Sequence, residues 1–271
     1  MSAVSPVPEV PAPAPTGAAP FLTAAHRARP VERVAWTVGA ALIVSGLFHL
    51  VVFFVAGGPW DGPVSWRKPF TFGVSFGLTL LAVAWVTSYL RVGARVRAVL
   101  LGLFAADCVL EVAGITVQAW RHRPSHFDME TPVDTAIALS LAFGGALLVV
   151  VLGVFAAAAF KHRPDGPAGM PLALRAGFAL LLVGLLSGAA MIARGVVLTR
   201  SGHQDAAYHS TGALKPLHGV SLHAVLVLPA LAWLLSRTGW SARRRERLVG
   251  VAAALYVAAA AAALGWGLLT A

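Results

Sequence analysis

Apolar residues dominate seven long stretches of the chain, and polar residues gather between them. The stretches lie near residues 34–56, 69–90, 98–120, 134–160, 174–198, 217–236 and 248–270. Each is long enough to cross a hydrocarbon core of roughly 30 Å at about 1.5 Å per residue. Lipid offers no partner to an unpaired backbone N–H or C=O group, so each crossing segment must be helical. The pattern predicts an all-α, polytopic membrane protein, a bundle of seven transmembrane helices.

Composition excludes the main soluble classes. Of the 271 residues, 58% are hydrophobic and only 12% are charged, and the mean hydropathy is +0.77. An ordinary soluble domain has about 25% charged residues. The net charge of +10 is not clustered on one soluble face, so we expect no nucleic-acid partner. The single cysteine, Cys108, lies in an apolar run and excludes a disulfide framework or a cysteine-rich zinc site.

The first 30 residues differ from the rest of the chain. They hold seven of its 17 prolines, a composition that favours extended, solvated conformers. We expect a disordered Pro/Ala-rich cytoplasmic tail over residues 1–30, followed by a seven-helix transmembrane domain over residues 31–271. The tail lacks the basic start and uninterrupted apolar core of a secretory signal peptide.

The distribution of Lys and Arg predicts the orientation of the bundle. If the N-terminus is cytoplasmic, 14 of the 21 Lys and Arg residues lie on the cytoplasmic side. The positive-inside rule then places the N-terminus inside and the C-terminus outside. We therefore expect a multi-pass protein of the cell (inner or plasma) membrane, surrounded by the lipid bilayer.

Polar side chains follow one face of the third predicted helix. Asp107, Glu111, Gly114, Gln118 and Arg121 recur at helical spacing. Charged groups near the centre of a bilayer cost several kcal/mol when they face lipid, so this face is expected to point into the bundle. Asp107 and Glu111 stand one turn apart, a spacing that suits proton handling; a purely structural ion pair is the alternative.

Ionisable groups from four predicted helices lie at similar depths. Counted at about 1.5 Å per residue, His49, Glu111, Arg194 and His223 lie roughly 6–13 Å below the outer boundary. We expect them to share one outward-facing polar pocket. Its expected rim comprises Lys68, Gln118, Arg121, His126 and His218.

The first functional hypothesis is a haem- or metal-dependent membrane oxidoreductase. Two imidazoles at matched depth on different helices suit axial ligation of haem iron, or a zinc, iron or copper site that includes a carboxylate. His49 and His223 are the expected ligands of haem b or a transition metal ion, and a quinone or small apolar molecule is a possible partner. Further candidate metal ligands are His126 and His218. The candidate catalytic groups are Glu111, Asp107 and Arg194. Lys68, Gln118 and Arg121 are candidate cofactor-binding residues, since the cations suit haem propionates.

The second hypothesis belongs to a different class. In it, the chain is a proton-coupled small-molecule permease or a ligand-binding membrane protein, and Asp107 and Glu111 couple protons to movement. The structural alternative to both hypotheses is that these side chains only form hydrogen bonds between helices.

Three segments resemble a family of bacterial seven-helix membrane proteins without an assigned biochemical activity. They are Trp-x-Lys-Pro at residues 66–69, Gln-Ala-x-Arg-x-x-x-Ser-His-Phe at 118–127 and Leu-His-Ala at 222–224. The resemblance spans roughly residues 34–236; it implies the seven-helix topology and no particular reaction. Better-known seven-helix classes fit poorly. The last predicted helix lacks the lysine of retinal proteins and the His-x-x-x-His element of ceramidase-like hydrolases.

Overall fold

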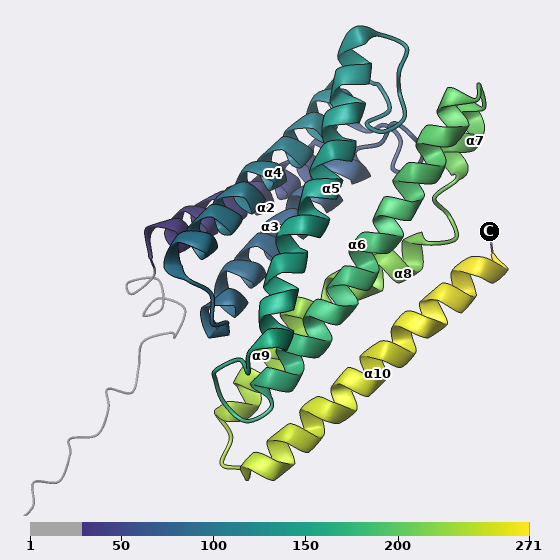
Figure 1. Ribbon diagram of the computed structural model, residues 1–271. Helices are drawn as coiled ribbons and strands as arrows, with labels where there is room; N and C mark the ends of the chain where they lie inside the picture. The colour runs from purple at the N-terminus through teal and green to yellow at the C-terminus, as the bar shows by residue number, and fades with distance from the viewer. Residues whose placement is uncertain (1–28, 271) are drawn as a thin grey trace, which may run out of the picture.

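The computed structural model describes residues 29–270, and this part of the chain is almost entirely helical (Figure 1). Within it, seven helical segments are long and apolar enough to cross a membrane. The prediction of an all-α, seven-span membrane protein is therefore confirmed. The expected disordered tail lies outside the described residues except for its last two positions.

The spans agree closely with the apolar stretches of the sequence. They are α2 (Pro30–Ala56), α3 (Arg67–Val86), α4 (Ala94–Trp120), α5 (Pro132–Lys161), α6 (Met170–Arg200), α8 (Lys215–Leu222) joined to α9 (Ala224–Ser236), and α10 (Ala242–Leu269). The short helices η1 (Thr87–Tyr89) and α7 (Gln204–His209) follow α3 and α6. Several helices begin earlier than hydropathy predicts, because their first turns carry polar residues such as Arg243 and Arg244.

The sixth span is irregular at His223, between α8 and α9. The backbone carbonyl of His223 accepts hydrogen bonds from the N–H groups of both Leu226 and Val227, each at 3.0 Å. Pro229 lies within the helix that follows. The backbone of His223 keeps right-handed helical angles (φ −85°, ψ −6°), so Lys215–Ser236 forms one span with a local irregularity at His223.

The spans form two groups on either side of α5 (Figure 1). Helices α2, α3 and α4 pack on one another, and α6, α8, α9 and α10 pack on one another. Helix α5 contacts α4 on one side and α6 on the other, and α3 also touches α9. The architecture is thus three spans, a connecting span, and three spans.

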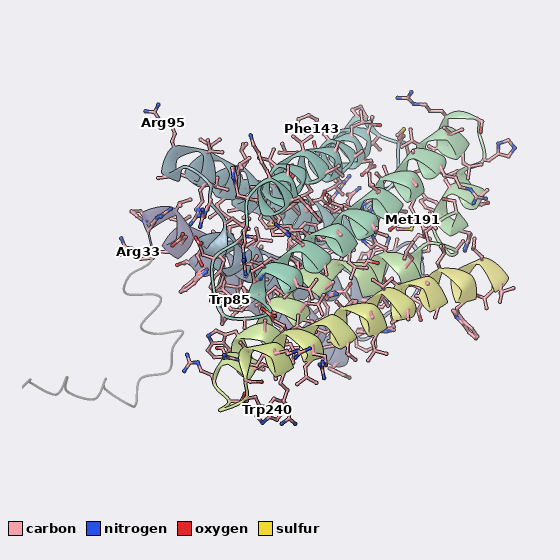
Figure 2. All side chains as sticks on the ribbon, turned by 60° about the horizontal axis from the view of Figure 1, so that its bottom comes forward. Arg33, Trp85, Arg95, Phe143, Met191 and Trp240 are labelled. Carbon is pink, nitrogen blue, oxygen red and sulfur yellow. The ribbon has the colours of Figure 1, made fainter. Side chains whose placement is uncertain are left out.

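The two ends of the bundle differ in their side chains. We call the end that carries the α2–α3 and α4–α5 loops the outer end, following the predicted orientation. The opposite, inner end carries Arg33, Arg95, Trp85 and Trp240 (Figure 2). There the guanidinium group of Arg244 lies 4.0 Å from the ring centre of Trp240, a pairing suited to a membrane boundary.

Glycines bring α2 and α3 into backbone contact. A Cβ atom at Gly73 would lie 2.8 Å from the Cα atom of Gly46, and one at Gly77 would lie 2.5 Å from the carbonyl oxygen of Gly39. Helices in lipid gain association energy from such close packing, since they have no hydrophobic effect to drive it. The α2–α3 pair is consequently a closely packed unit within the first group.

We predict that Gly77→Ala destabilises the protein by about 1–3 kcal/mol, because the added methyl group meets backbone atoms that cannot move aside cheaply. The matched control is Gly102→Ala on α4, where no heavy atom lies within 4 Å of the added Cβ atom. Thermal unfolding in detergent, followed by circular dichroism, measures the difference. Equal midpoints for the two variants would contradict the close-packing interpretation.

Candidate functional site

A buried carboxylate joins the end of α4 to the start of α5. The side chain of Asp134 is fully buried and accepts hydrogen bonds from Arg121 Nη1 at 2.6 Å, Gln118 Nε2 at 3.0 Å and Thr131 Oγ1 at 2.6 Å. Thr131 in turn accepts the backbone N–H of Asp134 and so caps α5. Gln118 and Arg121, expected at a cofactor, thus hold the α4–α5 loop (residues 121–131), which we call the outer loop.

The same loop extends to the second group of spans. Arg123 pairs with Asp128 and with Glu130, whose carboxylate lies 2.8 Å from Arg123 Nη2. Gln204 of α7 donates to the backbone carbonyl of Phe127 at 2.6 Å. The ring of Phe127 occupies the space beside Gly195 on α6. The outer loop therefore contacts α4, α5, α6 and α7.

His49 lies in an aromatic cluster between α2, α3 and α4. Its Nδ1 donates to the carbonyl of Ser45 at 2.7 Å, and its Nε2 accepts from Trp120 Nε1 at 3.1 Å. The ring of Trp66 stacks on it, with centroids 6.2 Å apart. Both ring nitrogens of His49 are therefore engaged, and neither is free to bind a metal unless one of these bonds breaks. The sequence did not predict Trp120 as a partner of His49.

Asp107 and Glu111 form an acidic pair on the interior face of α4. Both residues are buried, as the polar face of the helix predicts. A Cβ atom at Gly144 of α5 would lie 2.5 Å from Asp107 Oδ1 and 2.9 Å from Glu111 Oε1. The two carboxyls thus face the same glycine across the α4–α5 interface. Both carboxyl oxygens of Asp107 are buried without a hydrogen-bond partner in the described part of the chain.

The remaining members of the expected pocket lie in other settings. Arg194 is exposed on α6 rather than facing the interior, because a long side chain near a helix end can extend toward the membrane boundary. His223, between α8 and α9, donates Nδ1–H to the carbonyl of Gly219 in its own span at 3.0 Å. His218 donates to the carbonyl of Gly184 on α6 at 2.7 Å. The hydrogen bonds of the described residues therefore do not connect His49, Glu111, Arg194 and His223 into one pocket.

Lys68, Ser125 and His126 form a hydrogen-bonded row at the outer end. Lys68 Nζ donates to the carbonyl of Pro63 at 2.6 Å and to Ser125 Oγ at 3.4 Å. Ser125 Oγ lies 2.9 Å from His126 Nδ1. Burial and the charge of Lys68 lower the pKa of His126 to about 3, so its imidazole is neutral at physiological pH.

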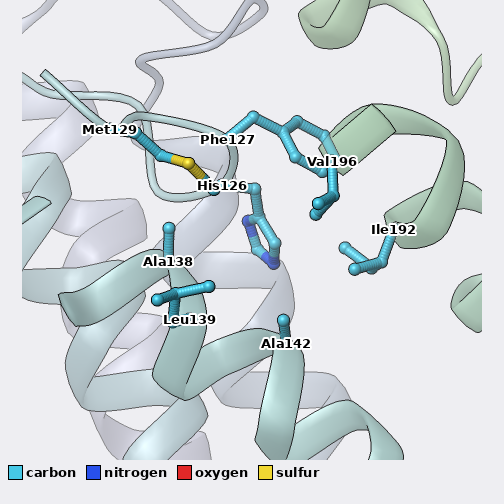
Figure 3. A pocket seen from close by; sticks show the side chains of 8 residues that line it. All are labelled: His126, Phe127, Met129, Ala138, Leu139, Ala142, Ile192 and Val196. Carbon is cyan, nitrogen blue, oxygen red and sulfur yellow. The ribbon is translucent and has the colours of Figure 1, made fainter. Parts of the chain in front are cut away.

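The ring of His126 points into a small pocket between α5 and α6 (Figure 3). We call it the lateral pocket. Its other lining residues are Phe127, Met129, Ala138, Leu139, Ala142, Ile192 and Val196. The free space of about 10 Å³ corresponds to roughly one water-sized group.

Within residues 29–270, no cluster of three or more His, Cys, Asp or Glu side chains is arranged to hold a metal ion. The candidate haem ligands fit poorly as well, since His49 Nε2 is occupied by Trp120 and His223 lies at the irregularity in the sixth span. The residues that the structure does bring together are the acidic pair at Gly144 and the row that ends at His126.

Comparisons of the chain with protein-family models, with curated proteins and with solved structures find no match. The resemblance to bacterial seven-helix proteins stays an expectation based on its three motifs. Two of these motifs have a structural role here, because Gln118, Arg121 and Phe127 hold the outer loop and Trp66 packs on His49.

We predict that Asp134→Ala loosens the outer loop, because it removes the common acceptor of Gln118, Arg121 and Thr131. Tryptic cleavage after Arg121 should then be faster in the variant. Asp61→Asn is the control, since Asp61 is an exposed partner of Arg67 in the α2–α3 loop. The prediction fails if limited proteolysis cuts Asp134→Ala and Asp61→Asn at the same rate in this loop.

Proposed function

We propose that this integral membrane protein is a proton-coupled permease for a small molecule, with Asp107 and Glu111 as its proton-binding site. The observation that carries the proposal is the buried, unpartnered carboxyl group of Asp107 next to a second buried carboxyl. Three further features support it.

The first is the chemistry of the acidic pair. Two neighbouring carboxylates in an apolar environment repel each other and lose their hydration, so at least one of them is expected to hold a proton. A protonated carboxyl gains an O–H donor, which can satisfy an oxygen of its neighbour. Ionisable groups inside a membrane domain commonly mark proton or substrate pathways.

The second feature is the position of the pair. Asp107 and Glu111 lie where the first group of spans meets α5, and only the missing side chain of Gly144 leaves room for them. Loss of a proton there introduces charge into a dry helix contact. A hydrated, more open arrangement of the helices is then favoured over the closed one. Binding or loss of the proton can shift the conformational equilibrium in this way.

The third feature is the local irregularity of the sixth span at His223. Many secondary transporters contain broken helices at membrane depth and move one helical group against another. Here the irregularity at His223 lies in the second group, and α5 separates that group from the first. The three-span, one-span, three-span arrangement provides two units for such a movement.

The haem- or metal-dependent redox hypothesis receives less support from the same geometry. His49 uses both ring nitrogens within the protein. The arrangement of the acidic pair favours proton coupling instead.

We expect infrared spectra of the purified protein to contain a carbonyl-stretching band of protonated carboxylic acid that is altered in Asp107→Asn and in Glu111→Gln. The band reports a carboxyl that keeps its proton inside the bundle. Glu130→Gln serves as the matched control, since Glu130 is an exposed carboxylate of the outer loop. A band that is absent, or that persists unchanged in both interior variants, would remove the proposed proton site.

We also expect pH to change the separation of α4 from α6. Spin labels at Val96 and Leu172, which are exposed on these helices, would report the distance in a Cys108→Ala background. The distance distribution should change from acidic to alkaline pH in this background and stay fixed in the Asp107→Asn, Glu111→Gln double variant. A distribution that ignores pH, or that responds equally in the double variant, would refute the coupling of protons to movement.

A further inference from the structure

The lateral pocket has one polar wall in an otherwise apolar lining. Of its eight lining side chains, only that of His126 carries nitrogen or oxygen atoms, and its ring points into the space between α5 and α6 (Figure 3). In ligand sites, one placed polar group in an apolar lining fixes the orientation of the ligand; here the free space of about 10 Å³ has room for one such ligand atom.

The hydrogen bonds of Ser125 favour one ring nitrogen of His126 as the carrier of the proton. Lys68 is a donor only, so Ser125 Oγ must accept from it. The single hydroxyl hydrogen of Ser125 is then available for His126 Nδ1, 2.9 Å away. With Nδ1 acting as acceptor, the neutral imidazole carries its proton on Nε2.

This tautomer is opposite to that of three other histidines of the bundle. His49, His218 and His223 each donate Nδ1–H to a backbone carbonyl. His126 instead has a donor at Nε2. Ser125, which sets this arrangement, is itself only 2% exposed, so water does not compete freely for its hydroxyl group.

The surroundings of the pocket face lipid. Leu139 on α5 and Val197 on α6 are 45% and 66% exposed, and Phe143 on α5 is 69% exposed. Apolar side chains this exposed on membrane spans are in contact with acyl chains. The lateral pocket therefore lies beside an apolar surface suited to lipid, and its free space of about 10 Å³ admits one oxygen atom rather than a whole ring.

We propose that His126 Nε2–H binds the carbonyl oxygen of a lipid-soluble molecule, whose apolar body lies against the exposed apolar side chains of α5 and α6. The shared chemistry is a neutral carbonyl on an apolar body, supplied either by a quinone or by the ester group of a membrane lipid. A neutral donor in an apolar wall favours such an acceptor over an anion, whose desolvation would be uncompensated.

This site is separate from the proposed proton site. Ala142 lines the lateral pocket and Gly144 faces the acidic pair, and two residues on a helix are about 200° apart. The inference therefore goes beyond the proposed permease function and holds or fails independently of it.

The test is nitrogen-15 NMR of histidine-labelled protein in lipid nanodiscs. Three samples are compared: ether-linked lipids, which have no ester carbonyl; ether-linked lipids with a short-chain benzoquinone; and ester-linked lipids. We expect the His126 Nε2–H signal to be present in all three and to shift with quinone or with ester lipid, and the sample that shifts it identifies the source. A signal that is the same in all three samples, or a proton found on Nδ1, overturns the proposal.

Variants separate recognition from folding. His126→Phe should weaken binding of the effective ligand roughly two- to tenfold, as expected for loss of one neutral hydrogen bond; for the quinone, the quenching of protein fluorescence gives the affinity. Ala142→Leu keeps His126 but fills the pocket, and should abolish the shift of the His126 signal. The control His209→Phe changes an exposed histidine and should leave both readouts unaltered. Unchanged signals of His49 and His218 verify the fold; with the fold intact, undiminished binding by His126→Phe overturns the proposal.

Discussion

The organising constraint of this protein is that hydrocarbon supplies no hydrogen-bond partners, so each polar group must find one within the protein. The backbone meets this constraint by being helical. Side chains meet it locally, as when Thr79 and Thr87 donate to carbonyls one turn earlier, at 2.8 and 2.7 Å. His49, His218 and His223 follow the same rule, since each donates Nδ1–H to a backbone carbonyl. Asp107 departs from this rule, because both of its carboxyl oxygens are buried without a hydrogen-bond partner among the described residues, and the proposed proton site rests on this observation.

The position of Asp107 and Glu111 among the spans bears on the movement of helices proposed above. Close glycine contacts make α2 and α3 one unit, and the acidic pair of α4 lies where this group of spans meets α5. The lateral pocket lies on the opposite face of α5. Helix α5 thus borders both proposed sites, and both groups of spans pack against it.

Much of the fold could be predicted from the sequence, but the site could only be predicted in part. Hydropathy locates the spans because length and apolar character are local properties. The polar face of α4 was also predictable, since helical spacing places Asp107, Glu111 and Gln118 together. Depth, however, fixes the height of a residue and not its rotation about the helix axis, so His49 and His223 could share a layer without sharing a cavity. Partners such as Trp120 and Asp134 depend on packing between helices, which no local pattern encodes.

The outer loop also has a consequence for how the protein is made. All the side chains that bind Asp134 come from residues 118–131, immediately before it in the chain. Asp134 is therefore synthesised shortly after its hydrogen-bond donors. The hairpin of α4 and α5 can close once the fourth span has entered the bilayer. The hydrogen bonds of Asp134 can thereby form before the last three spans have been synthesised, whereas the contacts of Phe127 with Gly195 and Gln204 form only after α6 and α7 have been made.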